Sequence, residues 1–288
     1  MAILLSGAPV AAALREKSLA QAEVLRRQGI IPCLAILCIG DRPDAASYAA
    51  SLMKNAPKSG VETRWEEWPE SISPGEALAR ILRLNRDPLI HGILLLRPLP
   101  PHLDEEALCQ AIAPEKDVDC ATDLSLAGVF AGKKLGFPPA TPRAVMEILR
   151  FYNIPLAGKK AVVLGRSLVV GRPLALLLLA RNATVTVCHS RTGAEEIRRC
   201  SRQAQIVAAC LGRAEMVDAG FLSEGQIVLD VGINPTPEGG IVGDVRFAEA
   251  EPLAEAITPV PGGVGTVTTS VLAKHVILAA ARQNGIEL

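Results

Sequence analysis

The sequence predicts an α/β protein built of two domains, the second of them Rossmann-like. Strand-like and helix-like stretches alternate along the chain, which favours mainly parallel strands. The alternation starts again near residue 160 with an apolar strand, a glycine-containing turn and a long apolar helix. The 288 residues, 49% of them hydrophobic, are enough for two cores.

Each element of the first half follows from its hydrophobic spacing. Short continuous apolar runs indicate buried strands, and apolar residues three or four positions apart indicate helices. This spacing predicts strands at 32–39, 61–67 and 91–96, and helices at 9–28, 45–58, 75–86 and 104–112. The third strand ends at Arg97-Pro98, because proline interrupts the hydrogen-bond ladder. A helix over 143–152 is expected to connect the two domains.

The second half repeats the order of strand and helix. The same rules predict strands at 160–164, 184–188, 205–209 and 226–231, and helices at 171–181 and 194–201. A loop rich in proline and glycine, 258–265, precedes a last helix that ends near residue 283.

Composition and charge exclude several classes of protein. Lys+Arg and Asp+Glu number 30 each, and no basic run typical of nucleic-acid binding occurs. Seven cysteines without a CxxC pair argue against a disulfide framework or a metal site, and for a reducing compartment. The apolar N-terminus lacks the positive residues of a signal peptide, and the run 174–180 is too short to span a membrane. We therefore expect a soluble cytoplasmic protein.

A nucleotide site is predicted where the first strand of the second half meets its helix. Gly165 permits a tight turn out of the strand, Gly171 allows close approach near the helix start, and Pro173 suits a first helical turn. The helix N-terminus would then present free N–H groups to a phosphate. The glycine spacing is not the usual GxGxxG, so a plain strand-to-helix turn remains an alternative.

The following strand predicts which dinucleotide is bound. Folds that bind NAD place an acid after the second strand to hold the ribose 2′-hydroxyl. Here the strand 184–188 continues into His189-Ser-Arg-Thr, without an acid. Arg191, together with Arg166 from the first turn, could instead pair with a 2′-phosphate, which favours NADP. The alternative leaves both arginines as solvated surface charges.

Several motifs, taken in order, resemble those of the methylenetetrahydrofolate dehydrogenase/cyclohydrolase family. The second half carries Gly165-Arg-Ser-x-x-Val-Gly-x-Pro173, His189-Ser-Arg-Thr192, Asp230-Val-Gly-Ile-Asn234, Gly243-Asp244-Val245 and Pro259-Val-Pro-Gly-Gly-Val-Gly265. The first half carries Gly40-Asp41 with Tyr48, Gly92 through Pro100, Lys116-Asp-Val-Asp119 and Thr141-Pro142. The resemblance spans essentially the whole chain, and the last motif of the second half is highly specific.

The resemblance implies a domain organisation, a reaction and an assembly. Residues 1–142 with the C-terminal helix 267–288 would form an α/β folate-binding domain, and residues 143–266 a Rossmann-like NADP-binding domain, with a cleft between them. The implied reaction is the NADP-dependent oxidation of 5,10-methylenetetrahydrofolate to 5,10-methenyltetrahydrofolate, in a homodimer without a metal.

The resemblance also implies the site residues. Tyr48 would stack on the folate ring, Asp119 would hydrogen-bond the pterin, and the loop with Pro261, Gly262 and Gly263 would line the same cleft. The implied cofactor-binding residues are Gly165, Arg166, Ser167, Gly171, Ser190, Arg191 and Ile233. Each of the folate-side residues also has a structural interpretation, with Tyr48 as a half-buried helix aromatic, Asp119 as a loop cap and the glycines as a turn.

The chain departs from the family pattern at the residues that handle protons. The family's catalytic lysine follows the tyrosine by one helical turn, and that position is Leu52; the family's glutamine is replaced by Leu96. A family serine is Ala45, and the glycine after the second aspartate is Cys120. Two basic residues nearby, Lys54 and Arg97, are expected to point away from the site.

The lost groups predict which activity is lost. Hydrolysis of the methenyl group moves protons and needs a general acid or base, which two leucines cannot supply. Hydride transfer depends mainly on the alignment of two bound molecules. We therefore expect a dehydrogenase with little or no cyclohydrolase activity. The alternatives are a bifunctional enzyme with a displaced proton-transfer group, and a protein that binds folate and NADP without turnover.

Overall fold

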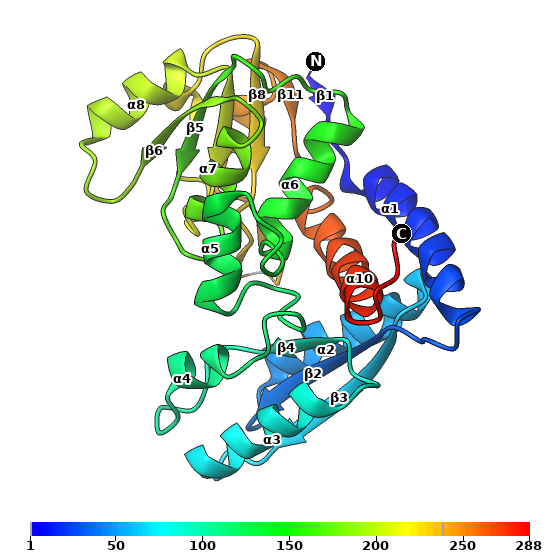
Figure 1. Ribbon diagram of the computed structural model, residues 1–288. Helices are drawn as coiled ribbons and strands as arrows, with labels where there is room; N and C mark the ends of the chain where they lie inside the picture. Colours follow the sequence, from blue (N-terminus) through cyan, green and yellow to red (C-terminus); the bar gives the residue numbers. More distant parts are fainter. Residues whose placement is uncertain (1, 238) are drawn as a thin grey trace. The chain divides into compact units, whose positions relative to one another are not determined.

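The computed structural model describes residues 2–237 and 239–288, which form two units (Figure 1). One unit contains Met1–Ala12 with Thr141–Thr268, and the other contains Ala13–Ala140 with Thr269–Leu288. The N-terminal residues thus lie outside the unit in which the sequence places them. The physical reason is a parallel strand pair: β1 (Ile3–Leu4) aligns Ile3 with Ala256 and Leu4 with Ile257 of β11 (Ala254–Ile257).

The first unit is built on a parallel sheet of six strands in the order β1-β11-β8-β7-β5-β6 (Figure 1). The remaining strands are β5 (Lys160–Leu164), β6 (Thr184–Cys188), β7 (Ile206–Ala209) and β8 (Gln226–Asp230). The sheet order reverses direction between β5 and β7, and ligands of such sheets bind at the carboxyl ends of the strands beside this point. β6 is an edge strand and is largely exposed.

Helices and a small hairpin complete the first unit. The helices are α6 (Ala140–Phe151), α7 (Gly171–Leu179), α8 (Ala194–Gln203), the 3-10 turn η2 (Ala219–Phe221) and α9 (Phe247–Ala250). An antiparallel pair, β9 (Asn234–Pro235) and β10 (Ile241–Val242), lies between β8 and α9 in the chain. A core of buried aliphatic residues from β5, β7, β8 and β11 holds the sheet together, with Phe221 and Leu222 packed into it.

The second unit has a parallel sheet of three strands in the order β3-β2-β4. The strands are β2 (Cys33–Ile39), β3 (Glu62–Trp68) and β4 (Gly92–Leu95). The helices are α1 (Gly7–Arg26), α2 (Pro43–Asn55), the 3-10 turn η1 (Ala56–Ser59), α3 (Pro74–Arg86), α4 (Glu105–Gln110) and α5 (Asp123–Ala131). β2 is central and almost wholly buried, which explains its continuous apolar sequence.

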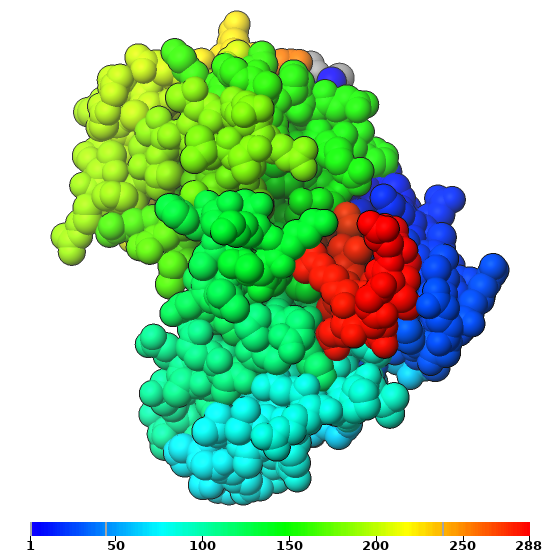
Figure 2. All heavy atoms as spheres, viewed as in Figure 1, coloured from blue at the N-terminus to red at the C-terminus, as the bar shows by residue number. Residues whose placement is uncertain are grey.

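The last helix, α10 (Val264–Gln283), carries the chain from the first unit back to the second. Among the described residues it is the one helix long and apolar enough to cross a membrane, but 67% of its apolar window is buried inside the molecule. That burial is typical of a core helix in a soluble protein. The C-terminal residues lie at the surface beside the α1 residues in the space-filling view (Figure 2).

Most predicted elements are confirmed, and the omitted strands share a cause. β5 and β6 have the predicted bounds, and the other expected strands and helices differ at their ends by a few residues. The prediction omitted β1, β9, β10 and β11, which are short and carry too few residues to show a period. It also omitted α5, although Thr122 caps its start and Gly132 ends it with a φ of 65°.

Candidate cofactor and substrate sites

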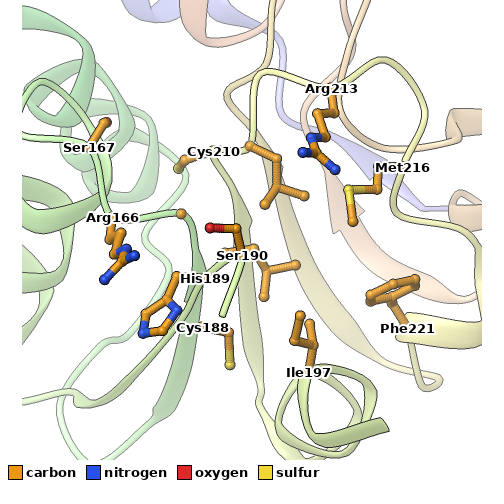
Figure 3. Close-up of a pocket in the computed structure, with 13 residues that line it drawn as sticks. Arg166, Ser167, Cys188, His189, Ser190, Ile197, Cys210, Arg213, Met216 and Phe221 are labelled. Atoms are coloured by element: carbon orange, nitrogen blue, oxygen red, sulfur yellow. The ribbon is translucent and has the colours of Figure 1, made fainter. Parts of the chain in front are cut away.

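A cavity of about 240 Å³ lies at the carboxyl ends of β5, β6 and β7. Each strand supplies one segment of its wall: 164–167, 188–190 and 210–213. Ile197, Met216 and Phe221 add apolar surface. Figure 3 shows Arg166 and His189 on one side of the cavity and Arg213 on the other. The cavity is therefore apolar with cationic groups at its margins, which suits a nucleotide with a phosphate.

Two glycines shape the turn beneath this cavity. Gly165 has a φ of 128°, and a Cβ built there would lie 2.2 Å from the carbonyl oxygen of Cys210. A Cβ on Gly171 would lie 2.3 Å from the carbonyl oxygen of Gly165. No other residue fits either position without a backbone shift. The turn therefore requires both glycines that the sequence analysis selected.

The start of α7 differs from the prediction of free N–H groups. The N–H groups of Val170 and Gly171 donate to Ser167 Oγ at 3.1 and 3.3 Å. The N–H of Arg172 donates to the carbonyl oxygen of Ser167, and Pro173 has no N–H. The expectation of free donors is wrong here, because the hydroxyl and carbonyl oxygens of Ser167 accept from these N–H groups. A phosphate could use these donors only by displacing that hydroxyl.

The structure separates the two arginines that were expected to hold a 2′-phosphate. Arg166, Ser190 and Arg191 are all exposed, and of these three Arg166 and Ser190 line the cavity. The N–H of Arg191 donates to His189 Nδ1 at 3.1 Å. Arg213, which the sequence analysis did not select, lines the opposite wall. The sequence signal for Arg213 is its position, four residues after a buried strand of the predicted Rossmann-like half.

A second cavity of about 250 Å³ is lined by the end of β8 and by the proline- and glycine-rich loop. It brings together Ile233, Pro261, Gly262 and Gly263, all of which the sequence analysis selected. A Cβ on Gly263 would lie 2.4 Å from the carbonyl oxygen of Pro259, so this tight loop depends on that glycine. Asp230 belongs to the same wall.

In the second unit, the motif Lys116-Asp-Val-Asp119 divides into structural residues and one candidate site residue. Lys116 Nζ donates to the carbonyl oxygens of Leu84 and Asp87. Asp117 is fully buried and accepts hydrogen bonds from Ala121, Thr122 and Ser125, at the start of α5. Both residues are therefore needed for folding rather than for chemistry.

Asp119 and Tyr48 form the candidate substrate pair. Asp119 Oδ1 accepts the N–H of Ala140 at 2.9 Å, which is the helix-capping interaction of the structural alternative. Burial raises the pKa of Asp119 to about 6, although this N–H bond acts to lower it. Tyr48 on α2 is 40% exposed, and partial burial followed by the negative charge of Asp119 raises its pKa. The two side chains are thus coupled electrostatically, and the Tyr48 ring remains available for stacking.

Leu52 and Leu96, which the resemblance places at polar positions of the family, are buried. Leu52 lies one turn after Tyr48 on α2 and is 2% exposed, and Leu96 directly follows β4 and is 7% exposed. Lys54 is exposed, as expected for the opposite face of α2. Arg97 pairs with Glu105 at 3.7 Å and its charge also acts to lower the pKa of Asp119. Arg97 therefore lies nearer to Asp119 than the sequence analysis expected, but a guanidinium remains protonated and cannot serve as a base.

Cys120 occupies a position that favours glycine. Its φ of 62° lies in the left-handed region, which residues with a Cβ rarely adopt. The side chain is 8% exposed, and burial raises the pKa of its thiol. The backbone required at this point therefore persists although the residue has changed.

We expect Asp119→Asn to gain stability over the wild type as the pH rises from 4 to 7. The carboxyl is neutral in both the folded and the unfolded chain below its usual pKa of 3.8. Between that value and about 6 the unfolded chain binds fewer protons, so the stability of the wild type falls. Urea unfolding of both proteins at four pH values measures the difference. A difference that stays constant with pH, or that falls, contradicts the raised pKa.

The fold and the first cavity define a class of protein. A parallel sheet with a glycine-dependent turn and a nucleotide-sized cavity at its carboxyl edge is typical of dinucleotide-binding enzymes. Residues 139–284 match the NAD(P)-binding domain of the tetrahydrofolate dehydrogenase/cyclohydrolase family, and residues 5–119 match its catalytic domain. The chain belongs to this family.

Named relatives are similar to this chain over nearly its full length. The chain is 46% identical over 286 residues to the bifunctional protein FolD of Alkaliphilus oremlandii, covering 99% of this chain and 100% of the relative. The structure of the bifunctional FolD methylenetetrahydrofolate dehydrogenase/cyclohydrolase from Campylobacter jejuni superposes with a TM-score of 0.95 at 37% identity, covering 98% of this chain and all of the other. The dehydrogenase-cyclohydrolase from Trypanosoma brucei, complexed with NADP cofactor and an inhibitor, gives a TM-score of 0.91 at 34% identity over 98% of both chains.

These similarities confirm the predicted family and the fold of an α/β catalytic domain with a Rossmann-like cofactor domain. A relative with bound NADP agrees with the predicted cofactor. The named relatives carry both activities, so the expected loss of one of them in this chain is a separate proposal.

Proposed function

We propose that this protein oxidises 5,10-methylenetetrahydrofolate to 5,10-methenyltetrahydrofolate with NADP, and that its cyclohydrolase activity is weak or absent. The family and the two named activities of its relatives support the reaction class. The second half of the proposal rests on Leu52 and Leu96, which the resemblance places where the family has proton-handling residues and which are both buried. In the same proposal, the unit of residues 13–140 with 269–288 would bind folate, and the unit of residues 1–12 with 141–268 would bind NADP. A homodimeric state and a cytoplasmic location also belong to it.

The residues of the first cavity fit a dinucleotide. Gly165 lets the turn after β5 pack against the backbone of Cys210, and Arg166 and Ser190 offer a cation and a hydroxyl to a 2′-phosphate. When bound, NADP supplies the hydride acceptor. Apolar side chains such as Ile197, Met216 and Phe221 exclude water from the base. In this proposal Arg191, which directly follows Ser190 but is not a lining residue, contributes less than Arg166.

The folate side requires alignment rather than proton transfer. Tyr48 is exposed enough to stack on a pterin, and Asp119 would accept hydrogen bonds from the pterin's N–H groups. Leu52 and Leu96 supply buried apolar surface where the resemblance implies polar groups. Hydride transfer needs two bound molecules held in line, whereas hydrolysis needs a group that gives and takes a proton. The geometry therefore supports oxidation better than hydrolysis.

A bifunctional enzyme is the second candidate function. The observation in its favour is the name of relatives about 46% identical over the whole chain, which carry both activities. It requires a displaced proton-transfer group, and Arg97, whose charge acts to lower the pKa of Asp119, carries a guanidinium, which does not serve as a general base. The third possibility is a protein that binds folate and NADP without turnover. It differs from both enzymes because it would form no NADPH.

The paired assay of one preparation tests the proposal. We expect purified protein to reduce NADP with 5,10-methylenetetrahydrofolate and to leave 5,10-methenyltetrahydrofolate decaying at the rate of buffer alone. A general acid or base contributes about 100- to 10,000-fold to such a reaction, so a retained cyclohydrolase is easily detected. Rapid enzymatic decay of the methenyl compound would establish the bifunctional enzyme, and saturable binding without NADPH would establish the binding protein.

A further inference from the structure

Two buried aspartates of the first unit have no role in the chemistry above. Asp230 ends β8 and is 3% exposed, and Asp244 belongs to the Gly243-Asp244-Val245 motif and is completely buried. A buried carboxylate is costly unless its oxygens accept hydrogen bonds, so the donors around each one indicate what the charge is used for.

Asp244 binds a segment that is more than thirty residues away in the chain. Its Oδ2 accepts the N–H groups of Leu211 and Gly212, and its Oδ1 accepts the N–H of Arg213 at 2.8 Å. The side-chain amide of Asn234 donates to the same Oδ1 at 3.0 Å. The one carboxylate therefore fixes three consecutive amides after β7, where Leu211 and Arg213 line the cofactor cavity.

Asp230 in turn holds the segment that carries Asp244. Its carboxylate accepts the N–H groups of Gly232 at 3.0 Å, of Asp244 at 2.9 Å and of Val245 at 2.9 Å. Its own N–H donates to Thr258 Oγ1 at 2.7 Å, which joins it to the end of β11. The two motifs are thus tied to each other by backbone hydrogen bonds.

The glycines of the two motifs complete the arrangement. A Cβ on Gly243 would lie 1.8 Å from Asp230 Oδ2, and a Cβ on Gly232 would lie 2.3 Å from Asp244 Oδ1. Each motif therefore contains a glycine that makes room for the aspartate of the other. This reciprocity gives a physical reason for the Asp230-x-Gly232 and Gly243-Asp244 pattern.

We propose that Asp244, supported by Asp230, is a positioning residue for the dinucleotide. Asp244 acts through Leu211 and Arg213, because it holds the backbone of these two residues at the cofactor cavity. It also acts through Asn234, which directly follows Ile233, a lining residue of the second cavity. The carboxylate does not line the cofactor cavity itself. The inference rests on the proposed use of NADP, and it assigns a role to two motifs that the reaction leaves unexplained.

Asp244→Asn tests this role, since the amide presents an NH2 group to N–H donors in either orientation. We expect the Kd for NADP, measured by titration calorimetry, to rise about tenfold or more, as for the loss of hydrogen bonds to a charged group. The KM for NADP should rise in parallel, while kcat at saturating NADP should change by less than about threefold, the kinetic pattern of lost ground-state binding. Hydrogen exchange should accelerate at the amides of residues 211–213.

Glu147→Gln is the matched control, because Glu147 is a buried carboxylate of the same unit that binds Arg143 and Arg150 on α6. It should lower the melting temperature without changing the Kd for NADP or the exchange of residues 211–213. A purely structural role for Asp244 predicts the same behaviour for both variants and would overturn the inference.

If Asp244→Asn does not fold, Asn234→Ala removes one of the hydrogen bonds to Asp244 and should raise the Kd for NADP about threefold. An unchanged Kd would also overturn the inference. Failure of the wild type to bind NADP refutes the proposed function instead.

Discussion

The double variant Leu52→Lys/Leu96→Gln is expected to gain cyclohydrolase activity of about 100-fold or more over the wild type, the contribution of a general acid or base. Lysine at position 52 would lie one helical turn from Tyr48, in a site where Leu52 is 2% exposed. Burial lowers the pKa of a lysine toward neutrality, which suits it for proton transfer. The measurement is the enzyme-dependent decay of 5,10-methenyltetrahydrofolate, with NADP reduction followed in the same preparation.

Apolar replacements provide the control for this gain. Leu52→Met/Leu96→Met keeps the volume and polarity of the site nearly constant and should remain without hydrolysis. Leu96→Gln alone should also gain nothing, because an amide does not titrate. A double lysine and glutamine variant that binds folate but hydrolyses no faster than wild type would show that the proton-handling site needs more than these two residues. Rapid hydrolysis by the unmodified protein would contradict the premise.

Arg166→Gln is expected to raise the KM for NADP by about 10- to 100-fold and to leave the KM for NAD nearly unchanged. The reason is the loss of hydrogen bonds from a charged donor to the 2′-phosphate, about 1.5–3 kcal/mol, which NAD does not form. Arg166 lines the cavity at the turn after β5. Steady-state kinetics with both dinucleotides at low ionic strength, where such contacts are least screened, measures the change in preference.

Two further arginine variants serve as a control and as a comparison for this experiment. Arg181→Gln removes an exposed charge after α7 and should leave both KM values unchanged. Arg191→Gln ranks the two arginines that the sequence analysis selected: an exposed side chain outside the cavity lining should matter less than Arg166. A larger effect at position 191 would show that the exposed loop moves toward the phosphate on binding. Equal losses with NAD and NADP at position 166 would contradict a role in cofactor choice.

Local sequence patterns determined much of the fold of this protein. The strands 160–164 and 184–188 are predicted to the residue, since a run of apolar and β-branched residues is readable without knowledge of its neighbours. Gly165 and Gly171 were identified because a tight turn restricts which residues can occupy it. The identities of Leu52 and Leu96 also come from the sequence alone, and with them the expected loss of hydrolysis.

The tertiary structure decided which groups meet across long chain separations. Only the folded chain shows that Arg213 lines the cavity from which Arg191 is absent, and that the Ser167 hydroxyl occupies the helix donors expected to be free. Likewise β1 joins the sheet through two residue pairs, and the carboxylate of Asp244 holds Leu211 and its neighbours. Periodicity records whether a residue is buried, but a hydrogen bond between distant segments depends on how the whole sheet is ordered, and no local window contains that information.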